Sequence, residues 1–249
     1  MKTSGGDKMK TRSMTVWVSI FLLAALLVVH AGAHAQSAGD ILQKTRDAYA
    51  QMKSYADTGV VIHEYGVSSQ DKHTFSTAFN RSPRHFLLDF HKVLGDRYVI
   101  WGDPDAFHTW WKATGQQTDY PNPNNASAIS LCGQCQGTAQ KIPTLLYWKA
   151  FGAAMLDIAD PVLDGTEEIG GRRCHRLTGR KSDVYGATGR EVNIRKVTVW
   201  IDTESFLIRK MVEESKPLPG QRARDITIYE PRANPTLQVA SFKFTPPAR

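Results

Sequence analysis

Two cysteines three positions apart are the residues with the clearest potential for chemistry. Cys132 and Cys135 form a C-x-x-C pair, and a third cysteine, Cys174, lies further along the chain. Such a pair at the start of a helix can carry out thiol redox chemistry, because the helix N-terminus lowers the pKa of a thiol. The thioredoxin type of this site needs a surrounding βαβ unit, whereas a long polar segment precedes this pair. A local disulfide, two free thiols and a redox pair therefore stay open, in that order of preference.

No other residue pattern points to catalysis or to a bound metal. The chain has neither a glycine-rich phosphate loop nor a G-x-S-x-G elbow. His85 and His91 share one face of a predicted strand, but six residues of strand separate them by ~20 Å, which is too far for one metal. Cys174 falls in a predicted strand, where a small buried apolar residue is expected. We therefore expect a protein that is not an enzyme, with no cofactor and no metal.

The first 35 residues have the three parts of a secretory signal. An apolar run over residues 16–29 is followed by the small-x-small pattern of Ala33 and Ala35. The run is shorter than the ~20 residues of a spanning helix, so we expect cleavage near Ala35 and a periplasmic protein with only transient membrane contact. Residues 36–249 suit a single domain. The basic residues at the start of the signal are Lys2, Lys8, Lys10 and Arg12.

The charge of the exported part excludes an obvious nucleic-acid partner. The whole chain carries +7, and the signal accounts for four basic residues and Asp7, which leaves about +4 for residues 36–249. Its lysines and arginines are scattered singly or in adjacent pairs such as Arg172 and Arg173. Nucleic-acid binding normally requires a clustered basic face, so a solvated surface is the better interpretation.

The elements that must position any site are a helix followed by a long antiparallel sheet. Residues 39–52 have an apolar stripe at helical spacing, with Asp40 as the candidate N-cap. From residue 58 the apolar period changes to two, and short turns join successive segments, which predicts a meander. The clearest strand is 84–92, where Phe86, Leu88 and Phe90 share one face. The strands predicted in this half are 59–65, 74–79, 84–92, 97–101 and 106–112.

A polar loop and a second helix interrupt the sheet. Residues 114–137 are rich in Gly, Asn, Pro, Gln and Ser and predict a loop that is functional or mobile. Residues 138–159 predict a helix that is apolar over a wide arc. The chain then returns to strands, and Phe242 and Phe244 predict a final strand ended by two prolines. The strands predicted here are 167–170, 173–178, 191–201, 206–213, 225–230 and the tail, about eleven in all.

The remaining candidate site is an apolar surface. A single twisted sheet of about eleven strands must curl, and a curled sheet that its own side chains cannot fill leaves room for a small apolar ligand. Several strands are apolar on both faces, so the pattern leaves open which face is concave. The residues expected to line this cavity are Phe86, Leu88, Phe90, Trp101, Trp111, Leu145, Trp148 and Met155.

Four short motifs resemble one family. The tail 242–247 (FKFTPP) resembles the F-x-F-x-P-P ending of the LolA/LolB-like periplasmic lipoprotein carriers. The segments 81–86, 102–111 and 197–211 are similar to that family's Arg-Pro turn, its D-G-x-x-x-W hairpin and its V-x-V-W-I-D hairpin. The resemblance extends over most of residues 36–249 and favours the uncharacterised predicted periplasmic branch of this superfamily. The C-x-x-C segment has no counterpart that we can place in the family.

The resemblance implies a mainly β fold with two helices. An unclosed antiparallel barrel, a half-barrel, is covered by the opening helix and by a mid-chain helical lid. In the family an arginine near the Arg-Pro turn holds the lid closed, and Arg81 is the nearest match, although Ser82 is inserted before Pro83. The implied function is non-enzymatic binding of a lipid or an acylated protein in the cell envelope. The alternatives are an interaction module for an envelope protein, as in relatives that regulate anti-sigma factors, and a thiol-redox protein that uses Cys132 and Cys135.

Overall fold

The computed structural model describes residues 36–121, 139, 141–147, 156, 158–185, 190–215, 219 and 222–247. The elements of this part of the chain follow in order: α2 (Ala38–Gln51), β1 (Ser54–Gly66), β2 (Ser69–Arg81), β3 (Arg84–His91), η1 (Val93–Gly95), β4 (Arg97–Gly102), β5 (Phe107–Trp111), β6 (Gln116–Tyr120), α4 (Lys141–Leu146), β7 (Ala159–Ile169), β8 (Arg172–Tyr185), β9 (Arg190–Asp202), β10 (Ile208–Ser215), β11 (Arg222–Tyr229), β12 (Arg232–Ala233) and η4 (Val239–Phe242). The predicted signal, residues 1–35, lies outside the described residues.

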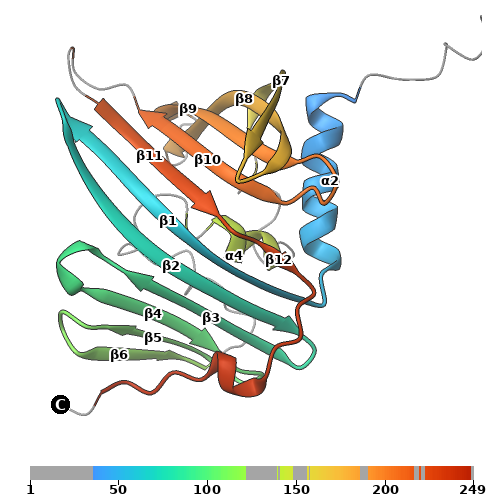
Figure 1. Cartoon of the computed structure of the whole chain (residues 1–249). Coiled ribbons are helices and arrows are strands. Elements are labelled where there is room, and N and C mark those ends of the chain that lie inside the picture. Colours follow the sequence, from blue (N-terminus) through green and yellow to red (C-terminus); the bar gives the residue numbers. More distant parts are fainter. Residues whose placement is uncertain are drawn as a thin grey trace, which may run out of the picture. The chain divides into compact units, whose positions relative to one another are not determined.

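All strands of the described residues belong to one twelve-stranded sheet (Figure 1). Its order is β6-β5-β4-β3-β2-β1-β11-β10-β9-β8-β7, with β12 paired to β1, and every pairing is antiparallel. The two end strands, β6 and β7, are not paired with each other, so the barrel is not closed. This confirms the predicted fold class, an unclosed antiparallel half-barrel with two helices.

The meander forms because most connections are tight turns. Gly66 adopts φ 63° at the turn from β1 to β2, and Gly170 and Gly171 adopt φ 57° and 74° between β7 and β8. These are left-handed conformations that glycine adopts without steric cost. One strand pairing is long-range and does not involve a tight turn. Strand β11 pairs with β1 through eight residue pairs, from Gly59 opposite Tyr229 to Gly66 opposite Arg222. This pairing joins the two sequential halves of the sheet into one surface.

Helix α2 begins with a capping box. Ser37 is the N-cap: its hydroxyl accepts from the Asp40 amide at 3.1 Å, and Asp40 accepts from the Ser37 amide at 3.2 Å. The prediction that Asp40 is the N-cap is therefore wrong, because Asp40 occupies the third helical position and supplies the reciprocal half of the motif. The helix buries Ile41 and Tyr49 completely, which fixes its apolar face on the sheet.

The sheet has an inner face and an outer face, which the strand registers define. Residues paired across neighbouring strands point to the same side. We call the inner face the one that carries Phe86, Leu88 and Phe90, which are opposite Phe79, Thr77 and Phe75 on β2. The inner-face side chains form one buried apolar cluster with residues of α2 and α4, so both helices cover this face. The outer face carries the alternate residues.

Three segments differ from the predictions. Residues 116–120 form β6 rather than loop, because their backbone pairs with β5 although the side chains are polar and mostly exposed. The second helix is described only over α4, and β7 begins at Ala159, where a helix end was predicted. The predicted final strand is wrong. Residues 239–242 form the 3₁₀ helix η4, and the segment that follows is irregular and lies against the outer face (Figure 1).

Candidate functional site

The apolar centre of the inner face contains three of the predicted cavity residues. Phe86, Leu88 and Phe90 of β3 are each 0% exposed. They alternate with half-buried residues that point to the outer face, as the period of two requires. All three belong to the cluster formed with α2 and α4. We call Phe86, Leu88 and Phe90 the apolar floor; that they line a cavity for a ligand stays a prediction.

Helix α4 crosses this floor, and every one of its six residues is buried. Leu145 is 4% exposed and joins the apolar cluster. Tyr147, directly after the helix, places its ring edge-on against Phe79, Phe86 and Phe107, with centroids 5.3 to 5.8 Å apart. The Tyr147 hydroxyl is buried without a hydrogen-bond partner in the described part of the chain. Burial raises the pKa of Tyr147 despite the nearby charges of Arg84 and Arg81.

The two predicted tryptophans of the sheet lie on opposite faces. Trp111 is opposite Tyr98, which is opposite Phe90, so Trp111 belongs to the inner face at its edge. There its indole N–H donates to the Asp96 carboxylate at 2.8 Å. Trp101 is one residue beyond the inner-facing Ile100, so strand alternation turns it to the outer face and away from the proposed cavity. Trp148 and Met155 lie outside the described residues.

Arg81 binds the C-terminal end of α2. Its guanidinium donates to the carbonyl of Met52 at 2.7 Å and to that of Tyr49 at 3.2 Å. A cation at this end also interacts favourably with the helix dipole. The Arg81 guanidinium also lies over the ring of Phe79 at 5.1 Å, which packs on Tyr147 directly after α4, and burial lowers the pKa of Arg81. The predicted role in holding a lid closed stays a prediction.

The cysteine pair cannot be placed, because Cys132 and Cys135 lie outside the described residues. Their disulfide and redox interpretations stay predictions. Cys174 is 0% exposed and packs with Trp200 and Val212 on the outer face, which confirms its prediction as a buried apolar residue. Burial raises the pKa of the Cys174 thiol to about 11, so this thiol is unreactive at neutral pH.

A buried carboxyl group lies on the inner face beside the apolar floor. Asp57 is opposite Thr77, which is opposite Leu88, and it is 2% exposed. The Tyr55 hydroxyl donates to one of its oxygens at 2.7 Å, and the other oxygen has no partner in the described part of the chain. Burial raises the pKa of Asp57 to about 7, although the Tyr55 hydrogen bond opposes the shift. Sequence analysis missed this group because the predicted strand began at residue 59. The signal that could have found it is an aspartate in an inward position of β1.

A charged cluster occupies the end of the inner face that is formed by β8, β9 and β10. The Lys141 ammonium of α4 lies 3.4 Å from the Glu213 carboxylate, and Nε of Arg195 lies 3.6 Å from its other oxygen. Lys181 is the cross-strand partner of Arg195. We call Lys141, Lys181, Arg195 and Glu213 the inner charged cluster. Sequence reasoning missed it, because the lysine of α4 and the strand residues are brought together only by the fold.

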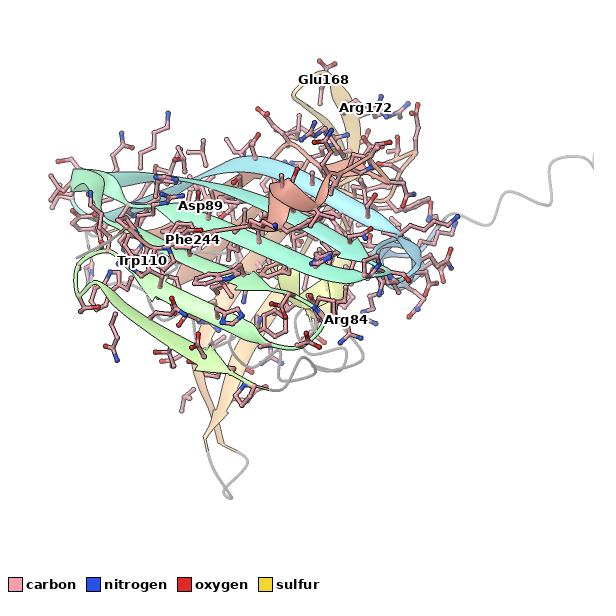
Figure 2. The ribbon with its side chains drawn as sticks, turned by 90° about the horizontal axis from the view of Figure 1, so that it is seen from below. Arg84, Asp89, Trp110, Glu168, Arg172 and Phe244 are labelled. Atoms are coloured by element: carbon pink, nitrogen blue, oxygen red, sulfur yellow. The ribbon has the colours of Figure 1, made fainter. Side chains whose placement is uncertain are left out.

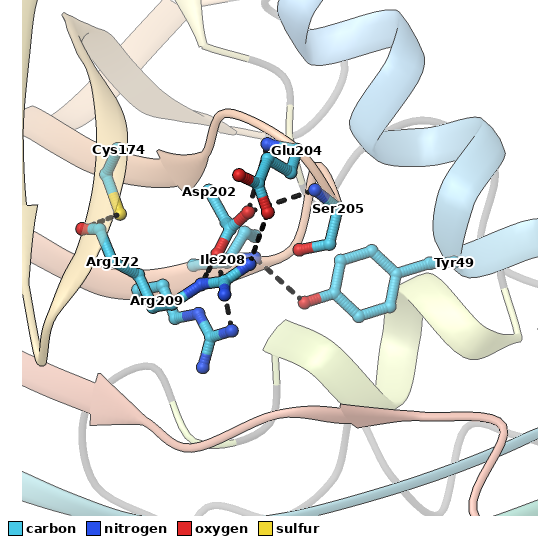
Figure 3. A network of polar contacts seen from close by, with 8 residues as sticks. All are labelled: Tyr49, Arg172, Cys174, Asp202, Glu204, Ser205, Ile208 and Arg209. Atoms are coloured by element: carbon cyan, nitrogen blue, oxygen red, sulfur yellow. Dashed lines mark hydrogen bonds and ion pairs between the residues drawn. The ribbon is translucent and has the colours of Figure 1, made fainter.

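The outer face carries a fully paired carboxylate at the hairpin from β9 to β10 (Figure 3). Asp202, whose side chain is 1% exposed, accepts from Arg172 at 3.0 Å and from Arg209 at 3.3 Å. It also accepts from the amides of Glu204 and Ser205 at 3.0 and 2.9 Å. Burial alone would raise its pKa, but the hydrogen bonds of Arg172 and of the two amides hold it well below the ordinary value. This group stabilises the hairpin.

The tail covers part of the outer face near β3, β4 and β5. Phe244 packs against Trp101 and Trp110, with ring centroids 5.1 and 5.3 Å apart, and the Arg97 guanidinium lies over its ring at 5.1 Å (Figure 2). Arg97 itself binds Asp89 through two hydrogen bonds of 2.7 and 2.6 Å. Next to this contact is a pocket of about 550 Å³. It is lined by His91, Gly95, Arg97, Trp110, Lys112, Gly115 and Pro247.

Two kinds of feature are absent from the described residues. No group of three or more histidine, cysteine, aspartate or glutamate side chains is arranged there to hold a metal ion. Of the helices in the same part of the chain, none combines the length and the apolar character that a bilayer span requires.

One family model matches the chain. It is described as "Predicted periplasmic protein (DUF2092)", and it matches residues 116–249, from β6 to the C-terminus. The chain belongs to this family. The predicted periplasmic family thus confirms both the resemblance and the expected periplasmic location. Among curated proteins no sequence matches the chain.

Several solved structures are similar to this periplasmic protein. The Mycobacterium tuberculosis lipoprotein LppX is 13% identical with a TM-score of 0.45, and the match covers 80% of this chain and 96% of that one. A LolA superfamily protein from Nitrosomonas europaea is 12% identical with a TM-score of 0.37, covering 84% and 99%. A third match is to the complex structure of Pseudomonas aeruginosa MucA/MucB, at 13% identity and a TM-score of 0.45, covering 84% of this chain and 61% of that one.

Proposed function

We propose that this periplasmic protein binds a lipid or an acylated protein without catalysis, between the inner face of the sheet and α4. The observation that carries the proposal is that α4 is short, entirely buried and laid across an apolar floor. Helices shorter than ~12 residues are marginal on their own in water. The contacts with the inner face therefore hold α4 in place, and an apolar ligand supplies equivalent contacts when it displaces the helix.

The chemistry of the floor suits an acyl chain. Phe86, Leu88 and Phe90 present a continuous apolar surface, and Leu145 covers it. Each methylene that leaves water contributes ~0.8 kcal/mol, so a chain of ordinary length binds tightly without any catalytic group. Trp148 and Met155 are proposed as further lid contacts, and Trp111 as a contact at the edge of the floor.

The proposal is tested first on the protein as purified. Native mass spectrometry after mild extraction is expected to find a bound lipid, and a fluorescent fatty acid is expected to bind the delipidated protein and to be displaced by palmitate. A protein that carries no lipid and binds no fluorescent fatty acid would overturn the proposal.

A pair of substitutions then separates lid binding from surface adsorption. Leu145→Gln places a polar group in the lid contact and is expected to weaken fatty-acid binding at least tenfold. Leu87→Gln is the matched control, because Leu87 is the half-buried neighbour of Leu88 that faces outward. It should alter the affinity less than twofold. Circular dichroism melts of both variants verify that the sheet is intact, and equal losses of affinity would contradict a site on the inner face.

Docking of an envelope protein is a second candidate, favoured by the pocket on the outer face. Arg97, Trp110 and Lys112 give this pocket an aromatic and cationic lining, which suits an acidic segment of a partner. A photo-crosslinking residue at position 112 is expected to capture a partner from an envelope extract after delipidation. The same residue at position 196, an exposed position on β9, is the control, and equal labelling at both positions would remove this candidate.

A further inference from the structure

Large apolar side chains are exposed on two turns at the same end of the sheet. In the turn between β3 and β4, Leu94 is 99% exposed and Val93 beside it is exposed as well. In the turn between β1 and β2, Val67 is 74% exposed, next to the exposed Tyr65. The two hairpins are neighbours, because β2 pairs with β3, and Figure 1 shows both turns along one side of the molecule. A group of exposed apolar side chains marks an interaction surface, whereas a single one does not.

The backbone of Leu94 has a conformation that leucine rarely adopts. Its φ is 66° and its ψ is 14°, which is the left-handed region that glycine and asparagine occupy more readily. The turn is nevertheless fixed to the sheet, because the Val93 amide donates to Nδ1 of the buried His73 on β2 at 3.1 Å. The Lys92 amide also donates to the Asp96 carbonyl at 2.8 Å. The fold thus holds a leucine in an unfavourable conformation without burying its side chain, which leaves that side chain available to another molecule.

Two lysines lie beside Leu94. Lys92 is two residues before it in the same turn, and Lys112 is in the turn between β5 and β6. The Lys112 ammonium donates to the Gly95 carbonyl at 2.7 Å, so it lies directly next to the exposed leucine. The one carboxylate in these three described turns is that of Asp96, which lies 3.9 Å from the Lys92 ammonium. Each ammonium group has three donors, and the one on Lys112 can therefore bind an anionic group while it keeps its contact with the turn.

The turns at the opposite end of the sheet differ in both respects. They join β2 to β3, β4 to β5, β7 to β8 and β9 to β10. Their charged residues are Asp103, Asp105 and Glu204, all of which are acidic. Among the described residues of these turns, none is an exposed large apolar residue. Exposed apolar side chains beside lysines therefore distinguish one end of the sheet from the other.

We propose that the turns between β1 and β2 and between β3 and β4 dock this periplasmic protein on the surface of an anionic phospholipid bilayer. Leu94 and Val67 enter the boundary between headgroups and acyl chains, and Lys92 and Lys112 contact lipid phosphates. A bilayer takes up single apolar side chains without a complementary pocket, and anionic lipids add electrostatic attraction. The contact involves few side chains, so the binding is weak and reversible. It is separate from the proposed cavity on the inner face and does not depend on it.

The test measures sedimentation of the protein with lipid vesicles. Vesicles of equal parts phosphatidylcholine and phosphatidylglycerol are expected to bind the native sequence about tenfold more tightly than vesicles of phosphatidylcholine alone. Leu94→Asn is expected to weaken binding to the anionic vesicles about tenfold, because asparagine accepts the left-handed conformation but places a polar group at the membrane. Lys92→Gln combined with Lys112→Gln should remove the preference for phosphatidylglycerol. Val162→Asn is the matched control, since Val162 is an exposed apolar residue on the edge strand β7, and it should leave vesicle binding unchanged.

A second measurement locates the contact. A spin label on the lipid headgroups is expected to broaden the amide resonances of Val67 and Leu94 more than those of Asp105 and Glu204 at the opposite end. Equal broadening at both ends overturns the proposal, and so does vesicle binding that Leu94→Asn and Val162→Asn alter to the same extent. A native protein that ignores anionic vesicles also overturns it. If such a protein instead self-associates in analytical ultracentrifugation and Leu94→Asn prevents this, the turns contact a second copy rather than a membrane.

Fatty-acid binding keeps this proposal distinct from the proposed function. Leu94→Asn should retain the affinity for the fluorescent fatty acid, because Leu94 lies outside the apolar cluster under α4. Leu145→Gln should in turn retain binding to anionic vesicles. Loss of vesicle binding in Leu145→Gln but not in Leu94→Asn would assign the vesicle contact to the inner face and overturn docking through the turns. Each proposal can therefore fail while the other stands.

Discussion

The two faces of the sheet differ in how their buried carboxyl groups are paired. On the outer face Asp202 is 1% exposed and accepts from two arginines and two backbone amides. On the inner face Asp57 is equally buried, at 2% exposure, but its hydrogen bonds come from the uncharged residues Tyr55 and Thr77 rather than from arginines. The same side chain is therefore held ionised on one face and pushed toward its neutral form on the other.

The difference indicates which face serves the scaffold and which faces a ligand. Groups that only stabilise a fold gain most when every hydrogen bond is made. Asp202 and the Asp89–Arg97 pair on the outer face fit this description. The inner face retains Asp57 and the Tyr147 hydroxyl, each with a buried oxygen that has no partner in the described residues. Incomplete pairing beside an apolar floor is the arrangement expected of a surface that another molecule completes.

The largest effect is expected from removing the charge of Asp202. Asp202→Asn removes the carboxylate that binds Arg209 and Arg172, although Arg172 keeps Glu204, and is expected to lower the free energy of unfolding by about 3 kcal/mol at pH 7. Its folded pKa lies below the unfolded value, so its contribution is present above about pH 4 and is lost as the pH falls further. Chemical denaturation at several pH values should show the two proteins converging in acid. Asp164→Asn, at an exposed ion pair with Arg176, is the control, with a loss under about 0.5 kcal/mol.

The opposite sign is expected for Asp57. Its folded pKa of about 7 lies above the ordinary value of 3.8, so the native state binds the proton more tightly and stability falls as the pH rises from about 4 to 7. Between pH 5 and pH 8 the protein should lose roughly 2–3 kcal/mol through this group. Asp57→Asn mimics the neutral acid and should lack this loss. If Asp57→Asn and the parent keep the same pH dependence, the contrast between the two faces is incorrect.

The tail should contribute less, because it packs on only one surface. Phe244 is half-buried between Trp101 and Trp110, and Phe244→Ala is expected to cost about 1–2 kcal/mol. The change should raise the solvent exposure of both tryptophans, which quenching of their fluorescence by acrylamide measures. Val239→Ala, at a residue that is 55% exposed, provides the comparison and should change neither quantity. Undiminished fatty-acid binding in Phe244→Ala would further separate the outer face from the proposed site.

The sheet could be predicted largely from its sequence because its signals are local. Strand β3 shows the period of two directly, and the turn residues around it mark the meander. The dependence of these predictions on local sequence signals also explains the errors. Phe242 and Phe244 alternate like strand residues, but the outer face of β3 to β5 offers them aromatic partners instead of a free strand edge. Strand β6 was missed because its side chains are mostly exposed and polar, so only its backbone pairing with β5 defines it.

The candidate site was predictable only in its apolar part. The alternation within one strand is enough to predict that Phe86, Leu88 and Phe90 share a buried face. The residues of the inner charged cluster belong to four different elements: Lys141 lies on α4, Lys181 on β8, Arg195 on β9 and Glu213 on β10. No local spacing connects these positions, since their contact depends on strand register and on where α4 crosses the sheet. The outward turn of Trp101 has the same origin, because a strand shifted by one residue exchanges its two faces.

The smallest effect concerns the coupling of the tail to the outer-face ion pair. Arg97 is held by Asp89 through two hydrogen bonds while its guanidinium covers the ring of Phe244. Asp89→Asn removes the charge that binds Arg97 and should weaken the stacking of the Arg97 guanidinium on the ring of Phe244. A double-mutant cycle of Asp89→Asn and Phe244→Ala is expected to give a coupling free energy of about 0.5 kcal/mol. The same cycle with Asp164→Asn in place of Asp89→Asn should give none. A coupling of zero in the first cycle would mean that the complete pairing of Asp89 serves the sheet alone and that the tail is held only by its aromatic contacts.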